Sequence, residues 1–262
     1  MMERRQTTNG LKTSRGEAGR KPPTPHFVLT GGPGSGKTTV AREMGAMLKR
    51  FGILTAGEVH TVQRGQLCAD DAHRTVHTIV REWFEKAKGG ILFIDEAERL
   101  VNENPNHCGR DVAEEIMSHL NEADDTVVIF AGYEKDMRKL YAVNEGLERR
   151  IYMEIHLADY EPRDLVEIFE RKAHEEGYKL RFNLTFLQES MSQKQVKSLI
   201  PRYNAGLVDH LLYAVETEIS SRTNDTQAVI MEIEKQDITE GFKKKVDELQ
   251  HRPHGQTKLF SR

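Results

Sequence analysis

The chain has 262 residues, of which 37% are hydrophobic and 30% are charged, and its formal net charge is −3. This length allows one large domain, or a medium and a small one, with a sizeable buried core. The charge balance gives no overall attraction to nucleic acid or anionic membrane, and no apolar run approaches the roughly 20 residues of a membrane span. Only two cysteines, Cys68 and Cys108, are present, and no secretory h-region precedes them. We therefore expect a soluble, intracellular, cytoplasmic protein without a disulfide framework.

The first 25 residues lack apolar periodicity. They carry six Lys or Arg against two Glu and end in Pro22, Pro23 and Pro25. Such a composition predicts a disordered basic tail. A basic, acid-poor segment is also typical of an organelle transit peptide, which is the alternative for this stretch.

A glycine-rich motif follows directly, and the rest of the chain is organised around it. The apolar run 27–29 leads into G-x-x-x-x-G-K-[ST], and a helical pattern comes next, with apolar residues at Val40, Met44, Met47, Leu48 and Phe51. Strand, glycine loop and helix together predict a phosphate-binding loop, because backbone N–H groups can close around phosphate only where no Cβ intervenes. An ordinary glycine turn is the alternative. The predicted phosphate-binding residues are Gly31, Gly32, Pro33, Gly34, Ser35, Gly36, Lys37, Thr38 and Thr39.

Residues 26–157 alternate strands and helices. We expect further strands at 57–62, 91–94, 126–133 and 151–157, and their continuous apolar runs predict a parallel sheet covered on both faces. Ligands bind at the carboxyl ends of such strands, where the glycine loop, Asp95, Glu96 and Tyr133 all fall. Beside a phosphate loop, Thr38 and Asp95 are expected to hold Mg²⁺, and Glu96 to polarise the attacking water. The alternative for Asp95 and Glu96 is solvation of a strand end.

From residue 158 the pattern becomes helical. We expect a second, all-helical domain over 158–249, in which Asp237 caps the final helix, followed by a polar tail at 250–262.

Four segments together resemble the CbbX/CfxQ type of AAA+ ATPase, which includes red-type Rubisco activases and the stage V sporulation protein K group. The resemblance runs from about residue 26 to about residue 221, and these segments are "GGPGSGKTT", "GGILFIDEAERL", "TVVIFAGYEKDM" and "NEGLERRI". It implies an α/β domain with strand order 5-1-4-3-2, a helical lid, and ring oligomers, hexamers in the family, that remodel a protein substrate with ATP and Mg²⁺. It also implies catalytic roles for Lys37 and Glu96, a nucleotide-proximal position for Tyr133, and an arginine finger at Arg150.

The chain departs from this family at three places. The stretch 69–73, "ADDAH", lacks the aromatic residue and glycine of the family's pore loop, and its two Asp would repel acidic peptides. The lid segment that matches "NAR-x-x-R" has Asn204 and Ala205, but Gly206 and Asp209 replace both arginines; Arg202 is the candidate substitute. The family's helical segment upstream of the loop is also replaced by the short tail.

Three functional hypotheses follow. The first is an active AAA+ ATPase that remodels a protein partner. The second is a degenerate ring subunit or nucleotide-gated scaffold, favoured by the missing lid arginines and pore aromatic. The third is a nucleoside monophosphate-type kinase, which shares the glycine loop but lacks "FIDEA" and carries an arginine-rich lid. DNA-acting motors of the same superfamily are a further possibility, but the sequence has no basic stripe that would support one.

Overall fold

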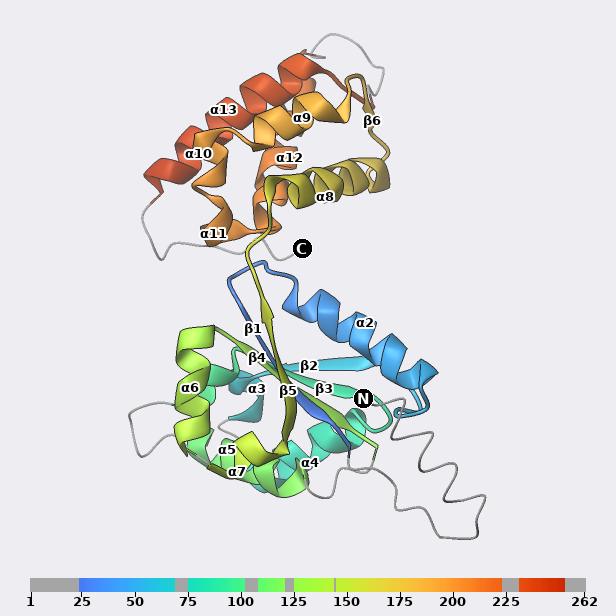
Figure 1. Ribbon diagram of the computed structural model, residues 1–262, viewed down its shortest axis with the longest axis vertical. Helices are drawn as coiled ribbons and strands as arrows, with labels where there is room; N and C mark the ends of the chain where they lie inside the picture. Colours follow the sequence, from blue (N-terminus) through green and yellow to red (C-terminus); the bar gives the residue numbers. More distant parts are fainter. Residues whose placement is uncertain are drawn as a thin grey trace. The chain divides into compact units, whose positions relative to one another are not determined.

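The computed structural model describes residues 24–68, 75–101, 108–120, 125–143, 145–222 and 231–252. The chain divides into two compact units (Figure 1). Unit 1 comprises the described residues up to Thr30 and from Lys37 to His156, and unit 2 comprises Gly31–Gly36 and the residues from Leu157 onward. Most of the two predicted tails, residues 1–23 and 253–262, lies outside the described residues, as does the stretch 69–73.

Unit 1 is built on a five-stranded parallel sheet. Its strands lie in the order β2-β3-β4-β1-β5, which is the predicted order 5-1-4-3-2 read from the other edge. The sequence prediction of this α/β fold is therefore confirmed. The bounds are β1 (His26–Gly31), β2 (Val59–Gln63), β3 (Ile91–Asp95), β4 (Val127–Gly132) and β5 (Ile151–Leu157).

Helices cover both faces of this sheet. Successive strand residues point to opposite faces, and because both sets are apolar, each face needs helices to bury it. Phe27, Leu29, Ile91 and Phe93 belong to a core shared with α2 (Lys37–Arg50). The alternate strand residues belong to a larger core on the other face. That core is completed by α3 (Arg64–Leu67), α4 (Val76–Lys86), the 3₁₀ helix η1 (Ala97–Leu100), α5 (Cys108–Leu120), α6 (Glu134–Val143) and α7 (Glu145–Arg150). These three layers are visible in the lower part of Figure 1.

The two cysteines form a disulfide bond, so the expectation of unpaired thiols is wrong. Cys68 follows α3 and Cys108 begins α5, and both pack against the same core. Their Cα atoms lie 5.8 Å apart, within the range that a disulfide spans. Because 40 residues separate the two cysteines in the chain, only the packing of α3 near α5 reveals the pair. The expected intracellular location therefore loses the support of two unpaired cysteines.

Unit 2 is mainly helical and surrounds a core of its own. A two-residue parallel ladder, β6 (Lys179–Leu180) with β7 (Glu232–Ile233), adds to the helices that the sequence predicts. The helices are α8 (Pro162–Glu175), α9 (Leu184–Met191), α10 (Lys194–Lys197), α11 (Ile200–Tyr203), α12 (Gly206–Arg222) and α13 (Lys235–His251). No helix among the described residues is long and apolar enough to cross a membrane.

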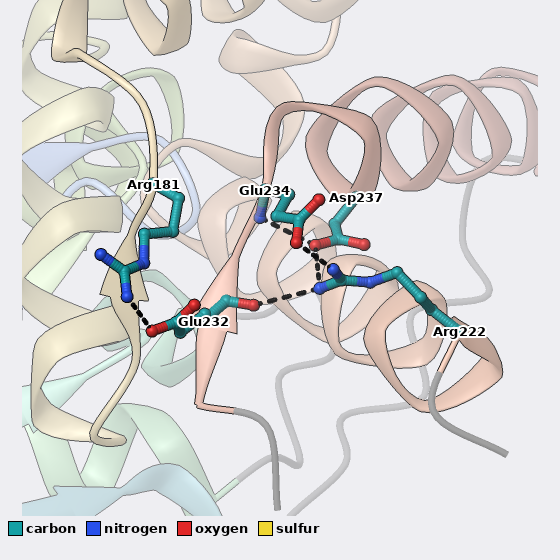
Figure 2. Close-up of polar contacts among 5 residues, drawn as sticks. All are labelled: Arg181, Arg222, Glu232, Glu234 and Asp237. Atoms are coloured by element: carbon teal, nitrogen blue, oxygen red, sulfur yellow. Dashed lines mark hydrogen bonds and ion pairs between the residues drawn. The ribbon is translucent and has the colours of Figure 1, made fainter. Parts of the chain in front are cut away.

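A charged network fixes the start of α13 (Figure 2). The N-cap residue is Glu234, whereas Asp237, predicted as the cap, lies one turn inside and accepts a 2.8 Å hydrogen bond from the Glu234 backbone N–H. Arg222 pairs with Glu234 and, at 3.0 Å, with the buried Asp237, and it donates to the Glu232 carbonyl. The Glu232 carboxylate in turn pairs with Arg181. The network joins α12, the β6–β7 ladder and α13.

Candidate functional site

The carboxyl edge of the unit 1 sheet gathers a lysine and three acidic side chains. Lys37 is the first residue of α2, which follows β1, and Asp95 is the last residue of β3. Burial lowers the pKa of the Lys37 ammonium, and the nearby carboxylates of Asp95, Glu98 and Glu96 oppose this effect. The structure therefore brings Lys37 close to Asp95 and Glu96, as the motifs predict. Thr38, half-buried, and Thr39, exposed, follow in the first turn of α2.

Glu96 has an unusual backbone conformation. Its φ of 52° and ψ of 42° place it in the left-handed region, where non-glycine residues are uncommon. Its backbone N–H donates to Asp95 Oδ1 at 3.0 Å, and its Oε2 lies 3.0 Å from Arg99 Nη1. Such local strain is typical of residues whose position matters for function. The turn directs the chain from β3 into η1, with Arg99 holding the Glu96 carboxylate.

Glu98 is a site residue that the sequence analysis missed. It is only 9% exposed, and its buried Oε2 atom has no hydrogen-bond partner among the described residues. Burial raises the pKa of Glu98, and the carboxylates of Glu96 and Asp136 raise it further. A Cβ at Gly132 would lie 2.1 Å from Glu98 Oε2, so the glycine of "AGY" leaves room for this carboxyl. In the structure its neighbours Ala97 and Leu100 are also buried in η1, and the sequence carries no signal that singles out Glu98.

Tyr133, which the resemblance places near the nucleotide, lies beside Lys37. Lys37 Nζ is 5.6 Å from the centroid of the Tyr133 ring, a distance that allows a cation–π contact. The Tyr133 carbonyl accepts hydrogen bonds from the amides of Asp136 and Met137 at the start of α6. Burial raises the pKa of the Tyr133 hydroxyl, with Glu98 adding to the effect, and the ring is 40% exposed. A half-exposed aromatic ring thus borders the lysine.

The glycine loop, residues 31–36, packs within unit 2. Gly34 and Gly36 have φ of +67° and +89°, and a Cβ on them would lie 2.5 Å from the Tyr203 carbonyl oxygen and 2.9 Å from the Tyr160 hydroxyl. These two positions therefore need glycine for both conformation and space. Ser35 is buried, and its Oγ atom has no hydrogen-bond partner in the described part of the chain.

Asn204 fastens this loop. It is fully buried, and its side chain accepts a 3.0 Å hydrogen bond from the Tyr160 amide. The same side chain donates to the Pro33 carbonyl at 3.1 Å and to Asp159 Oδ1 at 2.8 Å. The next amide, that of Ala205, donates to the Gly34 carbonyl at 3.2 Å. The resemblance marked Asn204 by position, but its hydrogen bonds to the loop could not be inferred from the sequence.

Asp209, which replaces a lid arginine, and Arg202, the candidate substitute, both contact other parts of unit 2. Asp209 pairs with Lys172 of α8. Arg202, the candidate substitute, donates to the Arg252 carbonyl at 3.2 Å and lies over the Tyr203 ring at 5.1 Å. Neither of these two contacts involves the glycine loop, and the role of Arg202 as a substitute stays a prediction.

Arg150 lies at the amino-terminal ends of the strands in unit 1, whereas Asp95 lies at their carboxyl-terminal ends. It is the last residue of α7, directly before β5, and its Nη1 atom donates to the Gly146 carbonyl at 2.8 Å. It lies near His26, which begins β1; burial lowers the pKa of His26 and the Arg150 charge lowers it further. Because the strands are parallel, Arg150 is separated by the length of a strand from Asp95 at the carboxyl edge. The structure does not bring Arg150 to Lys37 of the same chain.

Comparisons with known proteins agree with this architecture. Residues 27–156 match the family model of the ATPase family associated with various cellular activities (AAA). The chain is 33% identical over 209 residues to a CfxQ homolog of Trieres chinensis, covering 79% of this chain and 71% of the relative. It is 39% identical to protein CfxQ of Xanthobacter flavus, over 60% of this chain and 50% of that one. It is 35% identical to a chloroplastic ribulose bisphosphate carboxylase/oxygenase activase of Cyanidioschyzon merolae, over 64% and 59%.

The last two matches span only half to three fifths of the relatives' own lengths. Among solved structures, the AAA domain of FIGL-1 in complex with ADP has a TM-score of 0.58 at 18% identity, covering 85% of this chain and 72% of that one. The Holliday junction branch migration motor RuvB of Thermotoga maritima has a TM-score of 0.55 at 16% identity, covering 93% and 69%. Likeness at these identities shows a common fold alone.

Proposed function

Since the chain belongs to the CbbX/CfxQ type of AAA ATPases, we propose that it binds ATP with Mg²⁺, hydrolyses it, and uses the energy to remodel a protein partner within a ring oligomer. The observation that carries the proposal is the placement of Lys37 among Asp95, Glu96 and Glu98 at the carboxyl edge of the sheet, with Tyr133 beside it. A lysine beside several carboxylates suits a ligand that brings both negative phosphates and a divalent metal.

The residues present fit such a ligand. Gly34 and Gly36 keep side chains off the loop, and the buried Ser35 hydroxyl has hydrogen-bonding capacity to spare. The Lys37 ammonium would bind phosphate oxygens, and the Thr38 hydroxyl and Asp95 carboxylate are the oxygen ligands that Mg²⁺ prefers. Bound Mg²⁺ supplies positive charge that neutralises the phosphate oxygens.

Glu96 is the group proposed to orient and polarise the attacking water. Its carboxylate is paired with Arg99 in this structure, and the pair is partly exposed, so its contribution to stability is small and the carboxylate can be released at little cost. Burial and the neighbouring Glu96 and Asp136 carboxylates favour the neutral form of Glu98, which suits a positioning role rather than that of a base.

Steady-state ATP hydrolysis tests this assignment. Glu96→Gln should reduce turnover by two orders of magnitude or more, about what a general base contributes, while ATP affinity stays near that of the wild type. Glu85→Gln, on the exposed side of α4, is the matched control and should hydrolyse ATP normally. Equal turnover by wild type and Glu96→Gln would contradict the catalytic role.

Arg150 is proposed to complete the site of a neighbouring subunit. Its position at the amino edge of its own sheet supports action between chains, and such a finger is worth roughly 10³ to 10⁵ in rate. Mixing Arg150→Ala with Lys37→Ala should restore part of the activity, because a mixed interface combines an intact loop with an intact finger. No recovery at any mixing ratio would contradict sharing of sites between subunits.

A second candidate is a nucleotide-gated scaffold that binds ATP without efficient turnover. Asp209 at the position of a lid arginine, paired with Lys172, favours it, since a carboxylate there cannot stabilise phosphate charge. Tight Mg-dependent ATP binding with no turnover, in the presence of Lys37 and Glu96, would select this alternative.

A further inference from the structure

Two histidines and a glutamate meet between α4 and α5, outside the residues assigned to ATP. His77 Nδ1 lies 2.6 Å from Glu115 Oε1, and His119 Nε2 lies 3.1 Å from the same oxygen. One ligand atom from each side chain can be chosen so that all three lie within 4.8 Å of one another. We call these three residues the His–Glu–His cluster.

The backbone holds the cluster on two packed helices. His77 lies in the first turn of α4, and Glu115 and His119 lie one turn apart in α5. Both helices contribute to the same hydrophobic core, which includes Val80 and Ile116. Positions i and i+4 share a helix face, so Glu115 and His119 present their ligand atoms together.

Packing restrains two of the three side chains. The His119 ring stacks on Phe84, with 4.8 Å between centroids and 25° between planes. The Glu115 and His119 side chains are only 21% and 20% exposed, whereas that of His77 is 63% exposed. His119 Nε2 is shielded from solvent and makes no well-directed hydrogen bond within the described residues. The cluster thus has a restrained pair of ligands on α5 and an accessible third ligand on α4.

Two imidazoles and one carboxylate form a donor set that suits Zn²⁺ and disfavours Mg²⁺, which prefers oxygen ligands. Tetrahedral Zn²⁺, with bonds of about 2.0 to 2.1 Å, needs ligand atoms about 3.3 Å apart. The observed separations of 2.6 Å and 3.1 Å, and the limit of 4.8 Å, reach this value with small side-chain rotations. We propose that His77, Glu115 and His119 bind one Zn²⁺ ion that links α4 to α5, with water at the fourth position.

Zinc titration of metal-free, tag-free protein against a chromogenic chelator tests this proposal. Excess Mg²⁺ is added so that Zn²⁺ does not bind at oxygen-rich sites. The Cys68→Ser/Cys108→Ser double variant shows whether zinc binding needs the cysteine sulfurs. We expect one Zn²⁺ per chain in both wild type and the double variant. His77→Ala and Glu115→Gln should each weaken binding by about 100-fold or more, because loss of a ligand costs at least as much as loss of a supporting hydrogen bond.

His251→Ala is the matched control. His251 pairs with Asp247, one helical turn away, at 3.5 Å. This histidine–carboxylate pair resembles His119 with Glu115, but it lacks a third ligand equivalent to His77. Its zinc affinity should equal that of the wild type, and Zn²⁺ should raise the melting temperature of wild type and control but not of His77→Ala.

Co²⁺ added in place of Zn²⁺ should give the visible absorption of a four-coordinate site, and His119→Gln should abolish it. Unchanged zinc affinity in His77→Ala, absence of stoichiometric binding, or loss of binding only in the cysteine variant would overturn the proposal and leave the cluster as a hydrogen-bonded pair. His77 and Glu115 have no assigned part in ATP binding, so the result stands independently of the ATPase proposal.

Discussion

Replacing Asn204 by glycine tests whether this residue holds the glycine loop, residues 31–36, in place. Asn204 has φ 47° and ψ −128°, a conformation that glycine adopts more readily than other residues, so the substitution removes the side chain without adding backbone strain. It deletes three hydrogen bonds, to the Tyr160 amide, the Pro33 carbonyl and the Asp159 carboxylate.

The expected cost follows from these partners. A hydrogen bond between neutral groups contributes about 1 kcal/mol, and a buried partner left unsatisfied adds about 1 to 3 kcal/mol. Asp159 is exposed and can regain water, so its share is small. We expect the free energy of unfolding to fall by about 2 to 4 kcal/mol, and ATP affinity to fall about tenfold, since 1.4 kcal/mol of loop ordering corresponds to a factor of ten.

Urea unfolding followed by circular dichroism gives the first quantity, and titration with a fluorescent ATP analogue gives the second. Asn183→Ala is the control, because Asn183 caps α9 by accepting from the Phe186 amide at 3.1 Å. Loss of this cap should cost about 1 kcal/mol of stability and leave ATP affinity unchanged. Stability within about 0.5 kcal/mol of wild type and unaltered ATP affinity in Asn204→Gly would refute the reasoning.

Three further predictions concern other contacts. Gly132→Ala should lower the free energy of unfolding by about 1 to 3 kcal/mol in urea titrations, because its Cβ would collide with Glu98. Asp237→Asn should cost about 2 to 3 kcal/mol, since it removes the buried one of the two carboxylates that pair with Arg222. Burial, and then the adjacent Glu176 carboxyl, raise the pKa of Glu216 to about 7, so the folded state binds a proton that the unfolded state releases near pH 4.5. Stability should therefore fall as pH rises from about 4.5 to about 7, and Glu216→Gln should flatten this dependence.

Each of these predictions has its own control and contrary result. An added Cβ at Gly65 meets nothing within 4 Å, so Gly65→Ala should not destabilise the protein, and an equal loss at both glycines would contradict the collision at Gly132. Glu232 is an exposed partner of Arg181, so Glu232→Gln should change stability far less than Asp237→Asn. A stability profile between pH 4.5 and 7 that is the same in Glu216→Gln and wild type would exclude the proposed protonation.

Much of unit 1 could be predicted because its signals are local. The apolar runs ending at Asp95 and Gly132 gave strands β3 and β4, and the bounds predicted for β5 match the structure. The side of α2 that faces the core was predicted less well. Met47, expected on the apolar face, is 44% exposed, whereas Gly45 is buried, and a Cβ on it would lie 2.3 Å from the Gly57 carbonyl oxygen. The close approach of two backbones leaves no periodic signal in side chains.

The features that sequence reasoning missed all depend on contacts between distant segments. Glu98 stands two residues after the acidic pair, and only the packing of Gly132 against it reveals a buried carboxyl. The hydrogen bond from Asn204 to Pro33 spans 171 residues, and the Cys68–Cys108 disulfide spans 40. Hydrophobic periodicity and short motifs carry no information about such pairs.

Calorimetric titration with ATP tests the central claim most directly. We predict that the wild-type chain binds one ATP in the presence of Mg²⁺ and far less tightly without it, and that Glu96→Gln retains this binding. Lys37→Ala should weaken it by at least an order of magnitude, because the ammonium supplies a charge-assisted bond to phosphate in a partly buried site. Mg-independent binding, or equal affinity of wild type and Lys37→Ala, would contradict an ATP site at this edge of the sheet.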